Sequence, residues 1–547
     1  MTDYYSKIQQ KYHDQYNNNN NPTFFSSSQS ADLKIGYSKT SLEDLERLPT
    51  SARPVVDAND VVVPEGYDIE PVIVGLSFPL AITFADDGTI FLAEGGSTWP
   101  PRPYMPSRLL KLDPLSGKLD VIAIENLAGL RGITWKDDAI YAAIKGGYFS
   151  RIVKYDLKTG ERIVIVDKLP DGGWHSVNGP IFGQDGLLYF GQGSVSLNGI
   201  AGTGGFAVDL AKHPFAHDVP GQDVELTGKN CWNRYPTAPF PYLVETGAYK
   251  PFGTPSEKRE IIKGQLFCTT GLMRCKPDGS EPELLAWGIR NGFGMAFDEE
   301  GDLFVADFCM EEKDPRPIGE DPGRIWKIQN AKSSLGSVDT PDWYGFPDYC
   351  GDGLPVTDKK HMPMRGSAPE LLIANQSFPS PSPSSQPSPS SLPPLHLVAD
   401  KAVFLNEPHT GMGKMDFCRS DEFGYRGQLF MCQFGTFYPL NSLRPRHENN
   451  GFNVVRIDVN TGTSTSFAHN KFPGPASSAP SSTHDGISSN SSGGDSDSGG
   501  IERPVDCKFS PDGKSLYVVD FGRMKITKTH MVAYAHTGVL WKITKQG

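Results

Sequence analysis

The sequence lacks features that would indicate several common classes of protein. Its eight cysteines are spread over 547 residues without a Cys-x-x-C pair or the close Cys/His spacing of a zinc site. Cys268 and Cys432 lie within apolar runs, where a small buried side chain is expected. No long apolar run indicates a membrane span. The formal net charge of −12 argues against a nucleic-acid or anionic-membrane surface, because such surfaces need clustered Lys and Arg.

The chain start has neither the basic end nor the apolar stretch of a secretory signal, so an intracellular, cytoplasmic location is expected. Three polar segments hold too few apolar residues to offset the entropy of ordering. Residues 1–55 are expected to be disordered, and the tracts at 377–394 and 474–500 to be insertions in surface loops of one domain over 56–547.

The 58 glycines and 45 prolines favour a turn-rich β protein, and six similar units recur along the chain. Each unit is a short apolar strand, a turn that usually contains Asp-Gly, and a second strand rich in Leu, Ile, Phe, Val and Tyr, which is the pattern of a β-hairpin. The units span 79–96, 130–147, 177–194, 292–309, 414–435 and 504–522.

A second hairpin often follows the first, as in "RLLKLDPLSGKLDVI" (108–122), "RIVKYDLKTGERIVI" (151–165) and "NVVRIDVNTGTSTSF" (453–467). Two hairpins make a four-stranded sheet, and six sheets arranged radially make a six-bladed β-propeller, the all-β fold that we predict. The terminal runs "YDIEPVIVGL" and "GVLWKITK" are expected to share one blade and close the ring. Two unrelated β-sandwiches are the alternative.

In this arrangement, residues just before the first strand and just after the second strand of each unit return to one face. This face is expected to carry the functional site, because polar groups that converge over a channel are typical of one. The insertions at 195–263 and 340–413 are expected to surround the opening of the channel, here called the mouth, on the same face. The polar residues at strand entries are His175, Asn178, Arg290, Asn291, Lys414 and Arg503, and those at strand exits are Glu94, Lys145, Gln192, Asp307, Gln433 and Asp520.

Four segments make the chain resemble the glucose/sorbosone dehydrogenases, six-bladed propellers related to the soluble quinoprotein glucose dehydrogenases. The resemblance covers roughly residues 60–547 and rests on "HSVNGPIFGQDGLLYFGQGS", "AWGIRNGFGMAFDEEGDLFVAD", "WYGFPDY" and "IERPVDCKFSPDGKSLYVVDFG". It implies a dehydrogenase that uses pyrroloquinoline quinone (PQQ) to oxidise a sugar at the anomeric carbon and passes electrons to an external acceptor.

The resemblance also implies roles for individual residues. His175 matches the histidine that removes the proton of the sugar's anomeric hydroxyl, a role that suits a neutral imidazole. Arg290 and Asn291 match the pair that contacts the quinone oxygens, and Arg503 matches an arginine suited to a cofactor carboxylate. Lys414 completes the set of expected cofactor ligands. The expected sugar contacts are Trp343, Tyr344, Glu94 and Gln192.

The chain departs from the family at two places. The family's Arg-Asn-Pro is Arg-Asn-Gly here, and the family more often has tryptophan where this chain has Phe346. The main-chain carbonyls that hold calcium in the soluble glucose enzymes would fall near Cys309 and Met310, with Asp307 as a further candidate ligand. Family members that use this quinone usually work in the periplasm or outside the cell, in contrast with the expected location.

Two other functions fit the same fold, because fold alone does not fix function. The first is a metal-dependent lactonase or esterase, in which Glu94, Asn178, Asn291 and Asp307 would hold a divalent cation that activates water. The second is a non-catalytic propeller that binds a protein or glycan through its mouth. A basic mouth favours the quinone enzyme, whereas converging carboxylates favour the metal hydrolase.

Overall fold

The structure is a computed structural model. It describes residues 56–96, 106–113, 117–125, 129–203, 213–234, 243–313, 315–377, 392–398, 401–442, 444–479, 499–528 and 531–547, together with strands β1 (Thr23–Phe24) and β2 (Tyr37–Ser38). Apart from β1 and β2, which both pair with β8, the predicted disordered segment 1–55 lies outside these residues, as does the middle of both polar tracts. The ends of the tracts are ordered: Pro393 accepts a hydrogen bond from Asn375 Nδ2 at 3.1 Å, and Ala476 is buried with its amide bonded to the carbonyl of Ile501.

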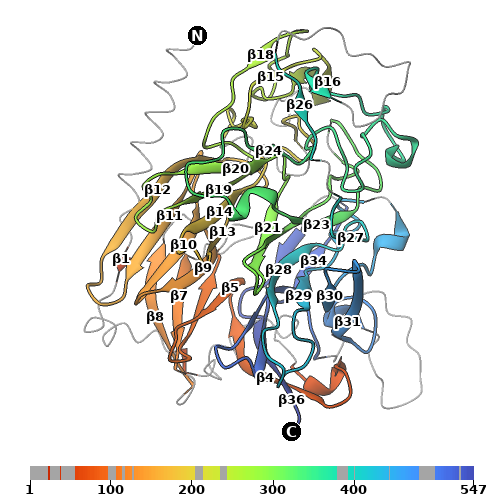
Figure 1. Ribbon diagram of the computed structural model, residues 1–547. Coiled ribbons are helices and arrows are strands. Elements are labelled where there is room, and N and C mark those ends of the chain that lie inside the picture. The colour runs from red at the N-terminus through yellow and green to blue at the C-terminus, as the bar shows by residue number, and fades with distance from the viewer. Residues whose placement is uncertain are drawn as a thin grey trace, which may run out of the picture.

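Six blades surround one axis, as predicted, and their strands are antiparallel except for the parallel pair β20 and β24 in blade 3 (Figure 1). From the innermost strand outwards, blade 1 contains β5 (Pro79–Phe84), β6 (Ile90–Glu94), β7 (Ser107–Leu112) and β8 (Lys118–Glu125), and blade 2 contains β9 (Gly129–Lys136), β10 (Ala139–Lys145), β11 (Phe149–Asp156) and β12 (Arg162–Pro170). Blade 3 contains β13 (Val177–Phe182), β14 (Leu188–Gln192), β19 (Gly271–Cys275), β20 (Glu283–Trp287) and β24 (Asp342–Trp343), and blade 4 contains β21 (Gly292–Phe297), β22 (Leu303–Asp307), β23 (Gly323–Lys327) and β27 (Phe404–Asn406). Blade 5 contains β28 (Met412–Phe417), β29 (Leu429–Gln433), β30 (Asn453–Asp458), β31 (Thr463–Asn470) and β3 (Val61–Val62), and blade 6 contains β32 (Pro504–Phe509), β33 (Ser515–Asp520), β36 (Gly538–Lys545) and β4 (Tyr67–Leu76).

The two ends of the propeller sequence close the ring. Strand β4 pairs antiparallel with β36, so blade 6 combines the N-terminal and C-terminal runs, as the sequence predicted. The inner strands β5, β9, β13, β21, β28 and β32 contact one another in this order, and β32 returns to β5. The closed ring therefore excludes the alternative of two unrelated β-sandwiches.

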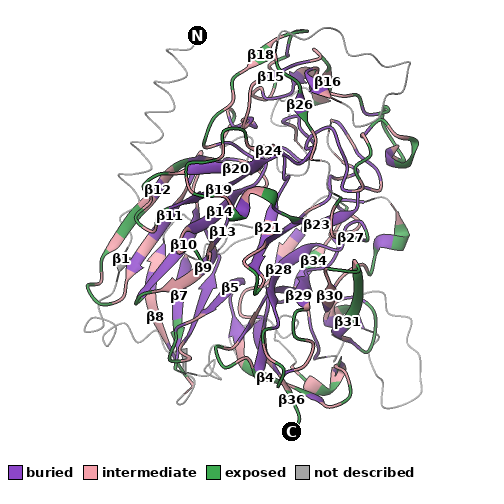
Figure 2. Cartoon of the chain, viewed as in Figure 1, coloured by how far each residue is buried: buried purple, intermediate pink, exposed green. Residues whose placement is uncertain are grey.

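Each boundary between neighbouring blades has its own hydrophobic core. Ala93 of blade 1 packs with Ile140 of blade 2, and an equivalent cluster fills each of the other five boundaries. Inner strands such as β28 are buried throughout, whereas the outer strands β12 and β31 carry exposed residues (Figure 2). The sheets are thus buried on both faces, and this explains the nearly continuous apolar runs of the sequence.

Every inner hairpin contains a β-bulge near the entry of its first strand. A bulge inserts one residue that has no partner on the neighbouring strand and turns its side chain out of the regular alternation. The residues at five of the six bulges line one cavity at this end of the channel; they are Leu80, Arg131, Phe293, Gly413 and Val505. The repeated bulge therefore builds the floor of a pocket.

Adjacent blades are joined by side chains that accept hydrogen bonds from the neighbouring inner strand's backbone. Asp506 Oδ2 accepts a hydrogen bond from the Ile82 amide at 3.0 Å, and Asp416 Oδ2 accepts one from the Phe509 amide at 3.1 Å. In blade 1, Thr83 Oγ1 accepts from the amide of Trp135 at 3.1 Å. These bonds fix the height of neighbouring inner strands relative to one another.

The connections outside the blades contain short strands and 3-10 turns. The strands are β15 (Val224–Glu225), β16 (Asn230–Arg234), β17 (Leu243–Gly247), β18 (Ile261–Ile262), β25 (Gln376–Ser377), β26 (Leu395–His396), β34 (Met524–Ile526) and β35 (Met531–Ala533). The turns are η2 (Ala58–Asp60), η3 (Gln329–Lys332), η4 (Lys359–His361), η5 (Pro445–His447) and η6 (Ala476–Ser478). Within the described residues, no helix has the length and apolar character needed to cross a membrane.

The narrow channel depends on glycines where inner strands meet. A Cβ on Gly132 of β9 would lie 1.7 Å from the carbonyl oxygen of Gly179 on β13, so the two strands would have to separate. We expect Gly132→Ala to lower the free energy of unfolding by at least about 1–3 kcal/mol, the cost of overpacking a core. Gly191→Ala is the matched control, because a Cβ there would meet its nearest atom at 3.5 Å. Thermal and urea unfolding of both variants measure the difference, and equal stabilities would contradict this account of the channel.

Candidate functional site

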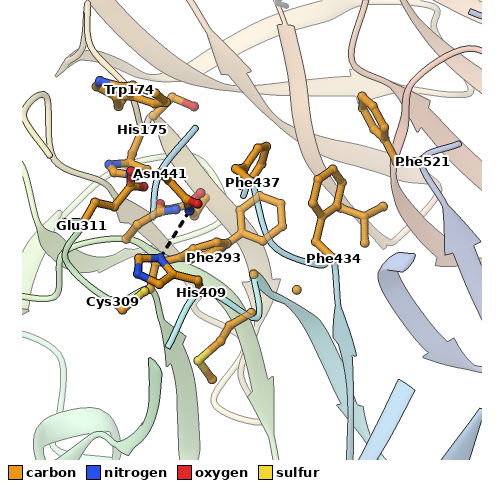
Figure 3. A pocket seen from close by; sticks show the side chains of 18 of the residues that line it. Trp174, His175, Phe293, Cys309, Glu311, His409, Phe434, Phe437, Asn441 and Phe521 are labelled. Carbon is orange, nitrogen blue, oxygen red and sulfur yellow. Dashed lines mark hydrogen bonds between the residues drawn. The ribbon is translucent and has the colours of Figure 1, made fainter. Parts of the chain in front are cut away.

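The cavity above the bulges has a polar end and an aromatic end. Figure 3 shows His175, Glu311, His409 and Asn441 together at one end, and Phe293, Phe434, Phe437 and Phe521 at the other. The rings of Phe434 and Phe437 are stacked with their centroids 5.6 Å apart. A ligand therefore meets flat apolar faces on one side and hydrogen-bonding groups on the other.

His175 lies in the loop that leads into β13 and lines the polar end of the cavity. Its backbone amide donates to the carbonyl of Ser194, and its Nδ1 lies 2.9 Å from Ser194 Oγ and 3.2 Å from the Ser194 carbonyl oxygen. Gly193 makes this approach possible, because a Cβ there would lie 2.4 Å from the Cβ of His175. The "GQGS" segment is thus shaped around the histidine.

The hydrogen bonds of Ser194 fix the tautomer of His175. The hydroxyl proton of Ser194 is donated to the carbonyl oxygen of Ser196 at 2.6 Å, so Ser194 Oγ accepts from the imidazole. The neutral ring therefore carries its proton on Nδ1, and Nε2 keeps the lone pair that a general base needs. Burial lowers the pKa of His175 well below 6.5, and Arg290 and Lys145 lower it further.

Two asparagines line the cavity beside His175. Asn178 Nδ2 donates to Asn291 Oδ1 at 2.8 Å, and the Asn291 backbone amide donates to Asp307 Oδ1 at 2.8 Å. These bonds leave the Asn291 Nδ2 hydrogens without a hydrogen-bond partner among the described residues. Asn291 therefore offers donors to a ligand, as the resemblance implies.

The three cations expected to bind a cofactor lie just behind the cavity lining. Arg290 donates to the Leu197 carbonyl at 2.7 Å and lies 3.5 Å from a carboxylate oxygen of Glu311. Lys414 Nζ donates to the carbonyl oxygens of Leu80 and Arg131 at 2.6 and 2.7 Å, which ties blade 5 to blades 1 and 2. Neither cation is among the lining residues, so a direct ligand contact by either would require a rearrangement.

Arg503 is enclosed by aromatic rings. Its guanidinium lies 5.2 Å from the ring centre of Phe434 and 4.9 Å from that of Phe452, and it donates to backbone carbonyls of residues 434–436. No carboxylate oxygen lies within 4.0 Å of it among the described residues. Burial lowers its pKa to about 10. Its charge therefore acts on the pocket through the aromatic wall.

The residues at strand exits support the backbone instead of facing the cavity. Glu94 accepts from the Ser77 amide at 2.6 Å and pairs with Arg108, and Asp307 also pairs with Arg324 at 2.9 Å. Asp520 accepts from the amide of Arg503 at 2.7 Å. Glu94 and Gln192, expected to contact sugar, are both about 1% exposed and do not line the cavity.

Trp343 and Tyr344 pack inside the protein. Trp343 belongs to the core between blades 2 and 3, where it stacks on Trp287 and donates from Nε1 to the carbonyl oxygen of Phe346 at 3.1 Å. Tyr344 is buried beside Trp326 between blades 3 and 4. Because protein encloses both rings, neither forms the expected aromatic platform for a sugar.

The cavity contains few groups that suit a metal ion. Cys309 lines it, but the neighbouring Met310 is fully buried and its amide donates to Asp321 at 2.6 Å. Glu311 is the one carboxylate among the described lining residues. The three-carboxylate cluster at Asp298, Glu300 and Asp302 lies in the hairpin turn that joins β21 to β22.

Several residues that line the cavity were not predicted from the sequence, because the prediction considered only residues at strand entries and exits. They are Arg131, Trp174, Phe293, Glu311, Lys313, His409, Phe434, Phe437 and Asn441. Burial raises the pKa of Glu311, and the nearby Arg290 opposes this shift. The aromatic and polar residues of the loops "EPHTGMG" and "FGTFYPLN" were the sequence signal that could have identified some of these lining residues.

No protein-family model and no curated protein matches the sequence. Among solved structures, the chain is similar to the PQQ-bound aldose sugar dehydrogenase of Streptomyces coelicolor, with 14% identity, 88% of this chain and 99% of that chain covered, and a TM-score of 0.44. The chain is also similar to the PQQ domain of pyranose dehydrogenase from Coprinopsis cinerea, with 15% identity, 88% of this chain and 97% of that chain covered, and a TM-score of 0.48. A gluconolactonase of Xanthomonas campestris is similar with 12% identity, 91% of this chain and 98% of that chain covered, and a TM-score of 0.34. Dehydrogenases and a lactonase are both represented, and none of these identities assigns a reaction to this chain.

Proposed function

We propose that the protein oxidises a hydroxyl group of a sugar, with His175 as the general base and PQQ as the hydride acceptor. The observation that carries the proposal is the hydrogen-bond arrangement of His175: Ser194 holds the proton on Nδ1, and the ring lines a cavity beside flat aromatic surfaces. The quoted motifs that resemble the glucose/sorbosone dehydrogenases support the same chemistry. Electrons would then leave to an external acceptor.

The chemistry of the lining fits a quinone of this kind, which is flat, anionic and rich in carbonyl oxygens. The phenylalanine rings offer faces for stacking, and Asn291 Nδ2 offers donors to an oxygen. Arg131 is the one cation among the residues at the bulges that line the floor, where it suits a carboxylate. The buried charges of Lys414 and Arg503 add a positive potential, which favours an anion.

When bound, the quinone would supply the hydride acceptor, and the chain's own residues would manage the proton. His175 Nε2 would take the hydroxyl proton as the carbon–hydrogen bond breaks, because its lone pair is available at neutral pH. Ser194 would keep the ring oriented while it becomes charged. The neighbouring cations would stabilise negative charge that develops on the acceptor.

The metal hydrolase receives less support. Two of its four proposed ligands, Glu94 and Asp307, are engaged with Arg108 and Arg324 behind the cavity wall. A hard divalent cation prefers several oxygen ligands, and the described lining offers only one carboxylate. We therefore do not place a catalytic metal at these residues.

A direct test is to incubate the purified protein with PQQ and calcium, remove free cofactor, and record the absorption spectrum before and after adding aldoses. We expect a bound chromophore that an aldose reduces. If wild-type protein retains no quinone under any condition, the quinone mechanism is wrong.

Replacing His175 should separate cofactor binding from turnover. In His175→Ala the aromatic wall and Asn291 remain, so we expect the quinone to bind as in wild type while kcat falls by about 10² to 10⁴, the usual contribution of a general base. His361→Asn is a matched control, because His361 is a fully buried histidine that does not line the cavity. Unchanged turnover in the alanine variant would assign His175 a structural role.

The lowered pKa of His175 predicts an unusual pH profile. A base works only when neutral, and its neutral fraction falls as pH drops through its pKa in the folded protein. Because burial and Arg290 lower that pKa well below 6.5, kcat/KM should stay constant as pH falls from 7.5 to about 6. Steady-state kinetics and ¹⁵N NMR of labelled histidines would measure it, and a midpoint at or above 6.5 would contradict the prediction.

A further inference from the structure

A groove adjoins the cavity on the other side of one short segment of chain. Residues 311–313 separate the two: Glu311 lines the cavity, Glu312 lines the groove, and Lys313 lines both. Consecutive Cα atoms are about 3.8 Å apart, so this wall is only one segment thick. The groove has a volume of about 720 Å³, within the range of roughly 300–1,000 Å³ that is typical of ligand sites.

Hydrogen bonds hold the separating segment in place. Asn198 is 1% exposed and donates from Nδ2 to the carbonyl oxygens of Glu311 and Lys313 at 2.7 and 2.9 Å. Its Oδ1 accepts from the Glu311 amide at 2.8 Å. On the groove side, the buried carboxylate of Glu312 accepts from the amide of Met364 at 2.5 Å. The cavity and the groove therefore keep a fixed position relative to each other.

An exposed tryptophan lines the groove. Trp232 lies on β16, among the connections beyond blade 3 (Figure 1), and is 61% exposed. Its ring contacts no other aromatic ring, and its Nε1 has no hydrogen-bond partner, within the described part of the chain. Pairing with Glu245 of β17 holds its backbone. Tryptophan is usually well buried, so a ring left exposed in a groove offers a flat apolar face to a ligand.

The rest of the groove is mainly polar. Arg365 is exposed and makes no hydrogen bond or ion pair among the described residues, so its guanidinium donors are available to a ligand. Its neighbour Met364 is the residue that Glu312 holds. Trp232 is the one aromatic side chain among the described residues that line the groove. A protein partner would need a larger apolar centre, whereas a sugar ring combines apolar C–H faces with hydroxyls at its edge.

We propose that the substrate is an oligosaccharide whose terminal unit enters the cavity at His175 while a following unit lies in the groove, stacked on Trp232 and bound by Arg365. The inference names the substrate class of the proposed oxidation and rests on it for the reacting unit. Trp232 and Arg365 act on specificity alone, because the separating segment keeps them from the reacting atoms. A monosaccharide in the cavity would leave the groove empty, so the groove selects for chain length.

Fluorescence titration tests the inference without turnover, on protein with and without PQQ. The probes are D-glucose, D-xylose, and malto-, cello- and xylo-oligosaccharides of two to four units. In at least one series we expect the tetrasaccharide to bind about three- to tenfold more tightly than its monosaccharide, the contribution of one aromatic contact. Trp232→Ala should lose this gain. Trp232→Phe should keep most of it, because a ring remains.

Two tryptophans can report binding at the two places. Trp174 lines the cavity, so its emission responds to the terminal unit, and the part of the signal that Trp232→Phe removes belongs to the groove. We expect this part to appear with the tetrasaccharide and not with the monosaccharide. Arg365→Ala should lower the tetrasaccharide affinity about fivefold, the contribution of one hydrogen bond. Phe472→Ala is the matched control, because Phe472 is 52% exposed and lines neither the cavity nor the groove.

Equal affinities for monosaccharide and tetrasaccharide in every series would overturn the inference, as would a gain that persists in Trp232→Ala. Steady-state oxidation with PQQ keeps the two proposals distinguishable. Oxidation that depends on His175, with kcat/KM independent of chain length, would overturn the inference alone. A gain with chain length that requires Trp232, without oxidation of any sugar, would instead contradict the proposed function alone.

Discussion

The site depends on the β-bulge that interrupts each inner strand where it enters the channel. Strands that stayed regular would alternate their side chains between the two neighbouring blades, and no residue would face the axis. The bulges release residues such as Arg131, Phe293 and Val505 from this alternation. The close contact at Gly132 and the bond from Asp506 to the Ile82 amide then hold the bulges at fixed heights. The floor of the pocket is therefore a property of the closed ring.

The electrostatics of the site follow from how its cations are buried. Lys414 and Arg503 donate to carbonyl oxygens and lie against aromatic rings, and the nearest carboxylate oxygen to Lys414 is 4.0 Å away. Burial lowers the pKa of Lys414 to about 8, which reflects the cost of keeping this charge from water. Charges that are only partly neutralised by the protein favour an anionic ligand, in agreement with the proposed quinone.

The sequence predicted the propeller because its signals are local and repeated. Asp-Gly turns fix the hairpin register, and β4 could be matched to β36 because both are apolar runs without a partner of their own. Placing His175 and Asn291 at the mouth followed from the same register. Glu94 and Gln192 do not line the cavity, because they end the second strands β6 and β14, whereas the bulges that turn residues toward the axis lie in the first strands β5 and β13. The sequence carries no periodic signal for these bulges. Trp343 lies in a core for a different reason: the parallel pairing of β24 with β20, which joins segments far apart in sequence, sets it beside Trp287.

Loops outside the repeats complete the pocket and give its two histidines different hydrogen-bonding roles. His175 is positioned by Ser194, one hairpin away, whereas His409 is positioned by Asn441 from a different loop. The two bonds impose opposite tautomers on two histidines that both remain neutral near pH 7. One ring can therefore accept a proton while the other can only donate a hydrogen bond. Under the proposed oxidation, this difference makes His175, and not His409, the acceptor for a substrate proton.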